Sequence, residues 1–327
     1  MLATPPNFDD LVNPLLKFYE QAEGRLSQLM GRAGISNFEY RRTQLLVDQI
    51  DSITRALQEK QRGWSARYLP RAYRSGRDLT AASFNLTKLP SLTLMDRRSI
   101  EALVARMTTD TSEALRSIAP FAQRVWTDSQ QVLIRETQLA EQIALGRVEG
   151  LGPVELGARL KQSFKDGATE RLKGYVPEAL RTDIEAAANG KYIGIMCRDG
   201  VYRQYDLTSY SELVANTATR MAATEGSINA TMEAGGDLVQ ISVHSGACEE
   251  CLALQGEVFS LTGATEGWPI LTDDERPPIH PNCEHVLVGV DADFLEARGQ
   301  TDALQEFSNS DEVVDNIDEY EAMLEGA

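Results

Sequence analysis

The chain has 327 residues, of which 42% are hydrophobic and 25% charged, and its formal net charge at pH 7 is −17. This length and composition are typical of a globular protein with room for two or more cores. No run of 18 or more apolar residues occurs, so the sequence predicts no membrane-spanning helix. The N-terminus lacks a basic segment followed by an apolar one, and we therefore expect no secretion signal and folding in the cytosol.

The first half of the chain shows the apolar spacing of amphipathic helices. Helices are predicted over residues 8–30, 37–61, 99–107 and 111–145. Glycines interrupt the first pattern at Gly31 and Gly34, and Pro120 is expected to kink or split the last helix. Residues 1–145 should therefore form a helical interaction domain, whose apolar faces pack against one another or against other subunits.

Residues 60–77, between these helices, carry six basic and three aromatic side chains and no acid. Such interleaving is typical of surfaces that bind phosphates and stack on bases. The arginines predicted for nucleic-acid contact are Arg62, Arg67, Arg71 and Arg74. The acidic net charge favours a simpler interpretation: the segment is a helix–loop junction, its aromatic residues lie in the core, and its arginines pair with acidic residues elsewhere.

The second half changes character near residue 146. Residues 191–197 and 201–206 flank an Asp-Gly turn and predict a hairpin. Ser209 and Glu212 predict a capping box for a helix that ends before Gly235. Residues 237–243 predict a strand.

The expected fold is α+β and mainly α, with a small α+β module over residues 146–290 after the helical domain. The tail, residues 291–327, carries twelve acidic side chains and one basic one. The simpler interpretation of this tail is a solvated, weakly ordered terminus. The alternative is an interaction segment that docks a basic partner through its scattered apolar residues.

All three histidines and three of the four cysteines lie between residues 244 and 285. Two residues separate Cys248 from Cys251, and His280 and Cys283 repeat this spacing, which lets both members of a pair reach one ion. The predicted metal ligands are Cys248, Cys251, His280, Cys283 and His285. Either His280 or His285 can complete a Cys₃His tetrahedron, and His244 is a further alternative. A thiolate-rich set with no spare position predicts structural Zn²⁺.

Other interpretations of the cluster explain less. Cysteines buried as small hydrophobic residues would account for neither the paired spacings nor the histidines. A catalytic Cys–His pair needs one cysteine, and no acid or oxyanion signature accompanies it. A zinc deaminase places His-x-Glu before the cysteine pair, whereas His244 is followed by Ser245 and Gly246. Cys197, in a predicted strand, is interpreted as a core residue.

The order of these elements resembles the phage minor capsid protein 2 family, within the wider Mu F-like group of head morphogenesis proteins. The resemblance covers roughly residues 130–290 and rests on the hairpin, the following helix, Cys-x-x-Cys, a Gly and aromatic segment, and the closing His-Pro-Asn-Cys-x-His. A weaker similarity surrounds residues 64–76. The family usually has an arginine where this chain has Glu284.

The resemblance implies a non-enzymatic, low-copy virion protein that assembles near the portal inside the procapsid. The implied partners are the portal protein, the major capsid protein and the scaffold protein, with weak contact to packaged DNA and none to membranes. One alternative is an effector enzyme delivered by the phage, because some Mu F-like proteins are fused to toxin or ADP-ribosyltransferase domains. Another alternative is an internal head protein that contacts nucleic acid through the basic residues of 60–77. The ordered Arg, Ser-x-Ser and Glu-x-Glu segments of such an enzyme are not found.

Overall fold

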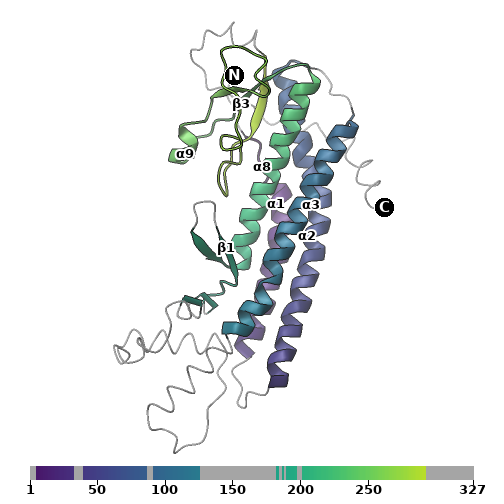
Figure 1. Ribbon diagram of the computed structural model, residues 1–327. Helices are drawn as coiled ribbons and strands as arrows, with labels where there is room; N and C mark the ends of the chain where they lie inside the picture. Colours follow the sequence, from purple (N-terminus) through teal and green to yellow (C-terminus); the bar gives the residue numbers. More distant parts are fainter. Residues whose placement is uncertain are drawn as a thin grey trace, which may run out of the picture. The chain divides into compact units, whose positions relative to one another are not determined.

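The computed structural model describes residues 5–32, 40–86, 91–125, 182–183, 186–187, 189–196 and 201–291 (Figure 1). These residues form an α+β fold that is mainly helical, as predicted. The helices are α1 (Asp9–Arg32), α2 (Tyr40–Ser83), α3 (Leu94–Arg116), α8 (Leu207–Glu233) and α9 (Glu249–Leu252). The strands are β1 (Ile193–Met196), β2 (Tyr202–Tyr205), β3 (Leu238–Ile241), β4 (Val258–Ser260) and β5 (Leu287–Val290).

The chain divides into two compact units that are each assembled from separate segments. Unit 1 comprises Met1–Leu15, Gln61–Thr108 and Glu212–Ala327, and unit 2 comprises Leu16–Lys60 and Thr109–Ser211. The helices α1, α2, α3 and α8 each contribute residues to both units. The predicted boundary at residue 145 and the acidic tail beyond Asp291 lie outside the described residues, so the predicted domain limits stay a prediction.

The helix α2 is longer than predicted and runs through the basic segment, with Pro70 inside it. The expectation of a helix–loop junction at residues 60–77 is therefore wrong. Its aromatic residues do lie in the core: Trp64 is 2% exposed and donates its indole N–H to the Leu11 carbonyl at 2.6 Å, and Tyr73 is fully buried. Burial of this face outweighs the roughly 3 kcal/mol penalty of an internal proline.

The helix α3 joins two predicted helices into one. Its N-terminus is a capping box, in which the Thr93 N–H donates to Asp96 Oδ2 at 2.7 Å and the Asp96 N–H donates to Thr93 Oγ1 at 3.2 Å. The gap predicted at residues 108–110 is absent, because Met107 and Thr111 are both buried and continue one apolar face. The chain turns at Ser117 and is helical again over residues 118–125, and the rest of the predicted helix lies outside the described residues.

The helix α8 begins and ends at turn-forming residues. The Asp206 carboxylate accepts hydrogen bonds from the Ser209 N–H at 2.7 Å and the Ser209 hydroxyl at 2.9 Å. The capping box predicted for Ser209 and Glu212 is therefore wrong, because Asp206 caps the helix three residues earlier. At the other end Gly235 has φ of 77° and the Gly236 N–H donates to the Thr231 carbonyl, as expected for a glycine stop.

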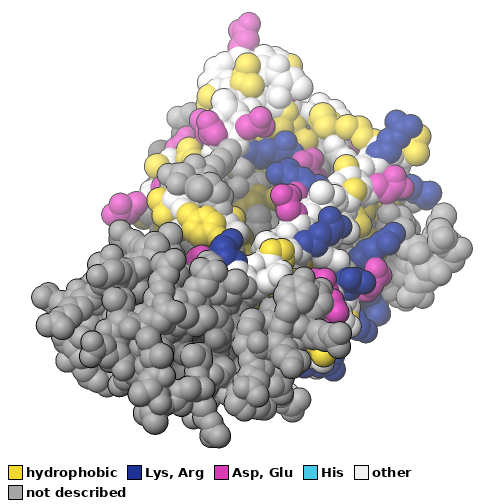
Figure 2. Space-filling model, turned by 60° about the horizontal axis from the view of Figure 1, so that its bottom comes forward, with side chains coloured by type: hydrophobic (Ala, Val, Ile, Leu, Met, Phe, Trp, Pro, Cys, Tyr) yellow, Lys and Arg dark blue, Asp and Glu magenta, His cyan; other side chains and the backbone are white. Residues whose placement is uncertain are grey.

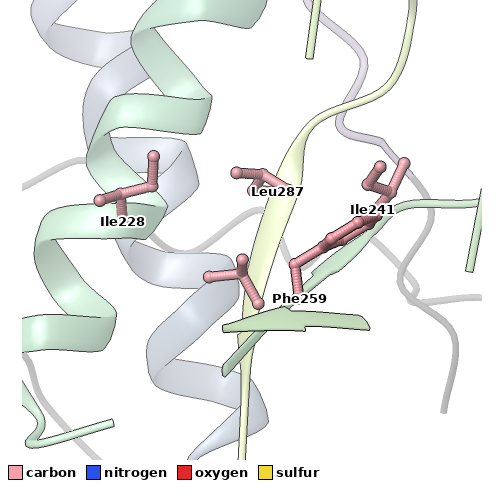
Figure 3. Close-up of a cluster of buried hydrophobic side chains, with 5 residues drawn as sticks. Ile228, Ile241, Phe259 and Leu287 are labelled. Atoms are coloured by element: carbon pink, nitrogen blue, oxygen red, sulfur yellow. The ribbon is translucent and has the colours of Figure 1, made fainter. Parts of the chain in front are cut away.

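Two antiparallel sheets follow. The predicted hairpin is confirmed: β1 pairs with β2 in unit 2, with Ile193 opposite Tyr205. In unit 1 the strands lie in the order β4-β3-β5, so β3 is central and pairs antiparallel with both neighbours. One face of this sheet meets α8 in a buried hydrophobic cluster (Figure 3). Its members are Ile228, Val239, Ile241, Phe259 and Leu287.

The backbones of α2 and α8 approach each other closely within unit 1. A Cβ atom added at Gly76 would lie 1.8 Å from the Ala223 carbonyl oxygen, and one at Gly226 would lie 2.0 Å from the Tyr73 carbonyl oxygen. The Ser227 hydroxyl donates to the Gly76 carbonyl at 2.8 Å across the same contact. Only glycine fits at these two positions, because the obstructing atoms belong to backbone that cannot move aside cheaply.

We expect Gly76→Ala to lower the free energy of unfolding by about 3 kcal/mol, because a methyl group would force the two backbones apart. Gly63→Ala is the matched control in the same helix, since its added Cβ meets nothing within 4 Å. This control should gain up to about 1 kcal/mol from helix propensity. Chemical unfolding of both variants measures the difference, and equal stabilities would contradict the close helix contact.

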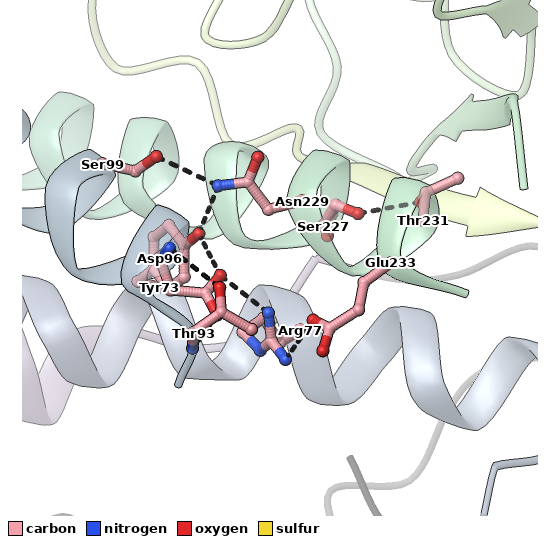
Figure 4. Close-up of polar contacts among 9 residues, drawn as sticks. All are labelled: Tyr73, Arg77, Thr93, Asp96, Ser99, Ser227, Asn229, Thr231 and Glu233. Atoms are coloured by element: carbon pink, nitrogen blue, oxygen red, sulfur yellow. Dashed lines mark hydrogen bonds and ion pairs between the residues drawn. The ribbon is translucent and has the colours of Figure 1, made fainter. Parts of the chain in front are cut away.

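A buried polar network joins α2, α3 and α8 in unit 1 (Figure 4). Asp96, which is fully buried, accepts hydrogen bonds from the Tyr73 hydroxyl at 2.6 Å and Arg77 Nη1 at 2.7 Å. Arg77, 1% exposed, also pairs with Glu233 at 2.8 Å. Asn229 donates to the Tyr73 hydroxyl at 2.5 Å. Each helix therefore supplies a group that another helix needs for its buried charge or hydroxyl.

Candidate metal centre

The pairing of β3 with β5 brings two distant parts of the sequence together at one end of the sheet. Residues after β3 lead through His244 to Cys248, the N-cap of α9, and to Cys251 within it. The segment from His280 to His285 comes directly before β5. The Ser242 N–H donates to the Val286 carbonyl at 3.0 Å, which fixes the two segments beside each other.

The predicted donors converge in two overlapping groups of three. Cys248, Cys251 and His280 form one group, and Cys251, Cys283 and His285 form the other, with the donor atoms of each group within 4.8 Å of one another. His280 Nε2 lies 3.2 Å from Cys248 Sγ and 3.0 Å from Cys251 Sγ. Cys251 Sγ lies 3.9 Å from Cys283 Sγ, which lies 3.6 Å from His285 Nδ1. The cysteines predicted from spacing alone are thus brought together.

Both imidazoles present a lone pair to the thiols. His280 Nδ1 lies 2.8 Å from the Pro281 carbonyl, which only accepts, so Nδ1 carries the proton and Nε2 the lone pair. Gln255 Oε1 accepts the His244 backbone N–H at 3.4 Å and also lies 3.3 Å from His285 Nε2. His285 Nε2 therefore carries the proton, which leaves its Nδ1 lone pair facing Cys283. Histidines that bind metals commonly place their second ring nitrogen on such an oxygen.

The thiols differ in their surroundings. Cys248 is exposed, and the backbone N–H of Cys251 is the main cause that lowers the pKa of its thiol. Cys251 is buried, and burial together with the neighbouring Cys283 raises the pKa of its thiol. Neighbouring thiolates such as those of Cys251 and Cys283 repel each other unless a cation lies between them, whereas a bound metal ion ionises its thiol ligands. The arrangement can therefore hold a metal ion.

His285 and His244 lie next to each other, but only His285 belongs to a donor group. His285 is fully buried, and burial is the main cause that lowers its pKa to about 4, helped by His244, His280 and Arg220. A neutral imidazole is the form that binds a metal. The His244 ring contacts the His285 ring at an angle of 46°, with centroids 4.4 Å apart, and His244 Nδ1 accepts the Gly246 N–H at 3.1 Å. Among the described residues, His244 belongs to neither donor group.

Sequence spacing missed Gln255, whose amide oxygen sets the tautomer of His285. The residue lies 30 positions before its partner, and no local pattern reveals that contact. Its backbone N–H also donates to the Cys251 carbonyl at 2.8 Å, so the turn after α9 positions it. Cys197, interpreted from sequence as a core residue, lies outside the described residues.

The arginines predicted to contact nucleic acid lie on α2. Arg62 and Arg67 are exposed, and Arg71 and Arg74 are partly buried. The guanidinium groups of Arg67 and Arg71 lie 5.7 Å and 5.5 Å from the centroid of the Tyr68 ring, so this aromatic group already has two cationic partners. In Figure 2, Lys and Arg side chains on the described surface are interspersed with acidic and hydrophobic ones. Phosphate binding by these arginines stays a prediction.

A comparison with known families identifies the chain's C-terminal part. Residues 178–322, which include β3, α9, β4, β5 and every candidate ligand, match the family model of phage minor capsid protein 2. This part of the chain is similar to the phage minor capsid protein 2 family. The family resemblance drawn from the cysteine and histidine motifs is therefore confirmed. No curated protein and no solved structure gave a match.

The match to the minor capsid family implies a location in the phage virion. The family is a structural one, which agrees with the expected structural rather than catalytic role. Among the described helices, none is both long and apolar enough to cross a membrane.

Proposed function

We propose that this minor capsid protein is a low-copy, Mu F-like structural component that joins the phage head near the portal, in a procapsid assembled in the host cytoplasm. The observation that carries the proposal is the match of residues 178–322 to the minor capsid family. The partners we propose are the portal protein, the major capsid protein and the scaffold protein. The resemblance supports them, and packaged DNA is a weaker candidate through the arginines of α2.

The metal we propose is one structural Zn²⁺, held by Cys248, Cys251, Cys283 and His280. Three thiolates and one imidazole are a typical closed set for zinc, and bond lengths of about 2.0–2.3 Å place tetrahedral ligand atoms about 3.5–3.8 Å apart. The 3.9 Å between Cys251 Sγ and Cys283 Sγ is close to this separation. His280 is preferred over His285 because its lone pair contacts two of the thiols, whereas that of His285 faces one.

The helical part is the proposed contact with the portal or capsid. Leu45 on α2 is 60% exposed, and Leu94 and Met95 at the start of α3 are 67% and 57% exposed. Adjacent exposed apolar side chains on one helix are typical of surfaces that another protein covers. Leu94 and Met95 are therefore the residues we expect a head partner to bury.

The test replaces Leu94 and Met95 together with glutamine in the phage gene. We expect the protein to remain folded but its copy number in purified heads to fall at least about tenfold, because two apolar anchors at an interface commonly contribute 1–2 kcal/mol each. Quantitative mass spectrometry of heads measures the copies per particle.

Arg98→Gln is the matched control for this test, because Arg98 is an exposed polar residue in the same turn of α3. It should leave the copy number in heads unchanged. Normal incorporation of the Leu94/Met95 variant would show that this end of α3 is not the contact. Failure to detect the unmodified protein in heads at all would contradict the proposed virion role itself.

A further inference from the structure

Cys248 is the exposed member of the cysteine cluster. Its side chain reaches the surface, whereas Cys251 and Cys283 are each only 1% exposed. Oxidation of a cysteine by a dissolved reagent depends on access to its sulfur atom. A dissolved oxidant therefore meets Cys248 before it meets the two buried thiols.

The backbone places a second thiol beside Cys248. Cys248 is the N-cap of α9, and Cys251 lies within that helix. The Leu252 N–H donates to the Cys248 carbonyl at 2.8 Å, which closes one helical turn around the pair. The two sulfur atoms lie within 4.8 Å of each other and of a donor nitrogen of His280. Residues three positions apart in a helical turn are neighbours, so rotation of the two side chains can bring the sulfur atoms into a disulfide.

Cys251 is the thiol that the two donor groups of the metal centre share. Its Sγ lies 3.0 Å from His280 Nε2 and 3.9 Å from Cys283 Sγ. A thiolate binds zinc, and a sulfur atom held in a disulfide is no longer a thiolate. A disulfide between Cys248 and Cys251 would therefore leave the proposed ion with Cys283 and His280 alone, which is too few ligands for a closed structural site.

We propose that Cys248 and Cys251 form a redox-sensitive pair, in which a hydroperoxide oxidises the exposed thiol and the resulting disulfide releases the zinc ion. This inference rests on the proposed zinc site. It makes Cys248 a modification site as well as a metal ligand.

The reaction proceeds in two steps. The Cys248 thiolate attacks one oxygen of hydrogen peroxide and the O–O bond breaks, which gives a sulfenic acid and hydroxide. The Cys251 thiolate then attacks the sulfenic sulfur, so that the S–S bond forms, the S–O bond breaks and a second hydroxide leaves. Two protons from solvent convert both hydroxides to water. The peroxide thus gains the two electrons that the sulfur atoms lose.

The proposed function supplies a change of redox conditions for this pair. A virion protein is made in a reducing cytoplasm, whereas virion surfaces are among the oxidising environments in which disulfides persist. The pair would hold zinc during assembly and lose it after release of the particle. This setting rests on the proposed virion role, but the reaction is tested on the purified chain, so a negative result leaves that role untouched.

The experiment treats the zinc-loaded full chain with hydrogen peroxide and follows the released metal with a chromophoric chelator. Bound zinc should fall from about one per chain to near zero, with the loss of about two free thiols. A dithiol reductant and fresh zinc should restore the original occupancy. Cleavage before Asp273 separates Cys251 from Cys283, so mass spectrometry should find the disulfide within one peptide.

Cys197→Ser is the matched control, because Cys197 is the one cysteine outside residues 244–285. It should release zinc under peroxide as the unmodified chain does. Zinc that stays bound, or a disulfide that joins Cys251 to Cys283 instead, would overturn the inference while the zinc site stands. If the untreated chain binds no zinc, the proposed metal site fails, and the inference fails with it.

Discussion

Cys248→Ser is expected to release the bound zinc and to unfold the α+β module predicted over residues 146–290. Structural zinc sites contribute about 10–16 kcal/mol of apparent folding free energy in small domains. A typical domain is stable by only about 5–15 kcal/mol in total, so the loss of one thiolate ligand can remove most of that stability. Zinc per chain, measured by elemental analysis, should fall from about one to near zero, and thermal unfolding should begin at a markedly lower temperature.

Glu250→Gln is the matched control, because Glu250 is an exposed residue between the two cysteines and offers no sulfur. It should keep its zinc and its stability. His280→Ala and His285→Ala extend the test: the first should lose zinc, and the second should retain it with lower affinity. Zinc loss in Cys248→Ser without a change in thermal stability would show that the ion is not structural. Zinc loss in His285→Ala alone would make that histidine the fourth ligand.

Asp96→Ala is expected to lower the free energy of unfolding by about 3–5 kcal/mol, because it leaves the buried Arg77 without its main counter-ion. The same change also removes the acceptor of the Tyr73 hydroxyl and the cap of α3. Asp51→Ala is the control: Asp51 pairs with Arg55 at 3.8 Å, and the two side chains are 40% and 77% exposed. It should change stability by less than about 1 kcal/mol.

Urea unfolding of the two aspartate variants measures both changes. A loss in Asp96→Ala as small as that in Asp51→Ala would mean that the network shown in Figure 4 does not stabilise the helices. The double variant Arg77→Met and Asp96→Leu offers a further check, since replacing both charges with apolar groups often restores stability.

Features that depend on a short stretch of sequence could be predicted from the sequence alone. The pairs Cys248/Cys251 and His280/Cys283 could be recognised because two donors two residues apart chelate from a single turn, whatever the rest of the fold does. The C-terminal end of α8 could be predicted in the same way, because Gly235 adopts the positive φ that ends a helix. The interpretation that the aromatic residues of the segment 60–77 lie in the core is confirmed for Trp64.

Other features could not be predicted, because they depend on residues far away in the chain. Residues 60–77 were expected to form a helix–loop junction, but tertiary burial of Trp64 and Tyr73 keeps α2 continuous through Pro70. Arg77 reads as one base in a basic segment, and only the fold reveals its partners Asp96 and Glu233. Gln255 was missed for the same reason: nothing near it in sequence shows that it faces His285.

The hydrogen bonds between β5 and α2 affect where the chain can be cut to produce a fragment. The Gly289 N–H donates to Thr80 Oγ1 at 3.1 Å, and the Gly289 carbonyl accepts the Ser83 hydroxyl. The strand that follows the candidate ligands is thus bonded to a helix about 200 positions earlier. A fragment cut at the limits of the family match, residues 178–322, would lack that helix. In such a fragment the Gly289 N–H and carbonyl would lose their partners Thr80 and Ser83, so β5 would lack the hydrogen bonds that attach it to α2.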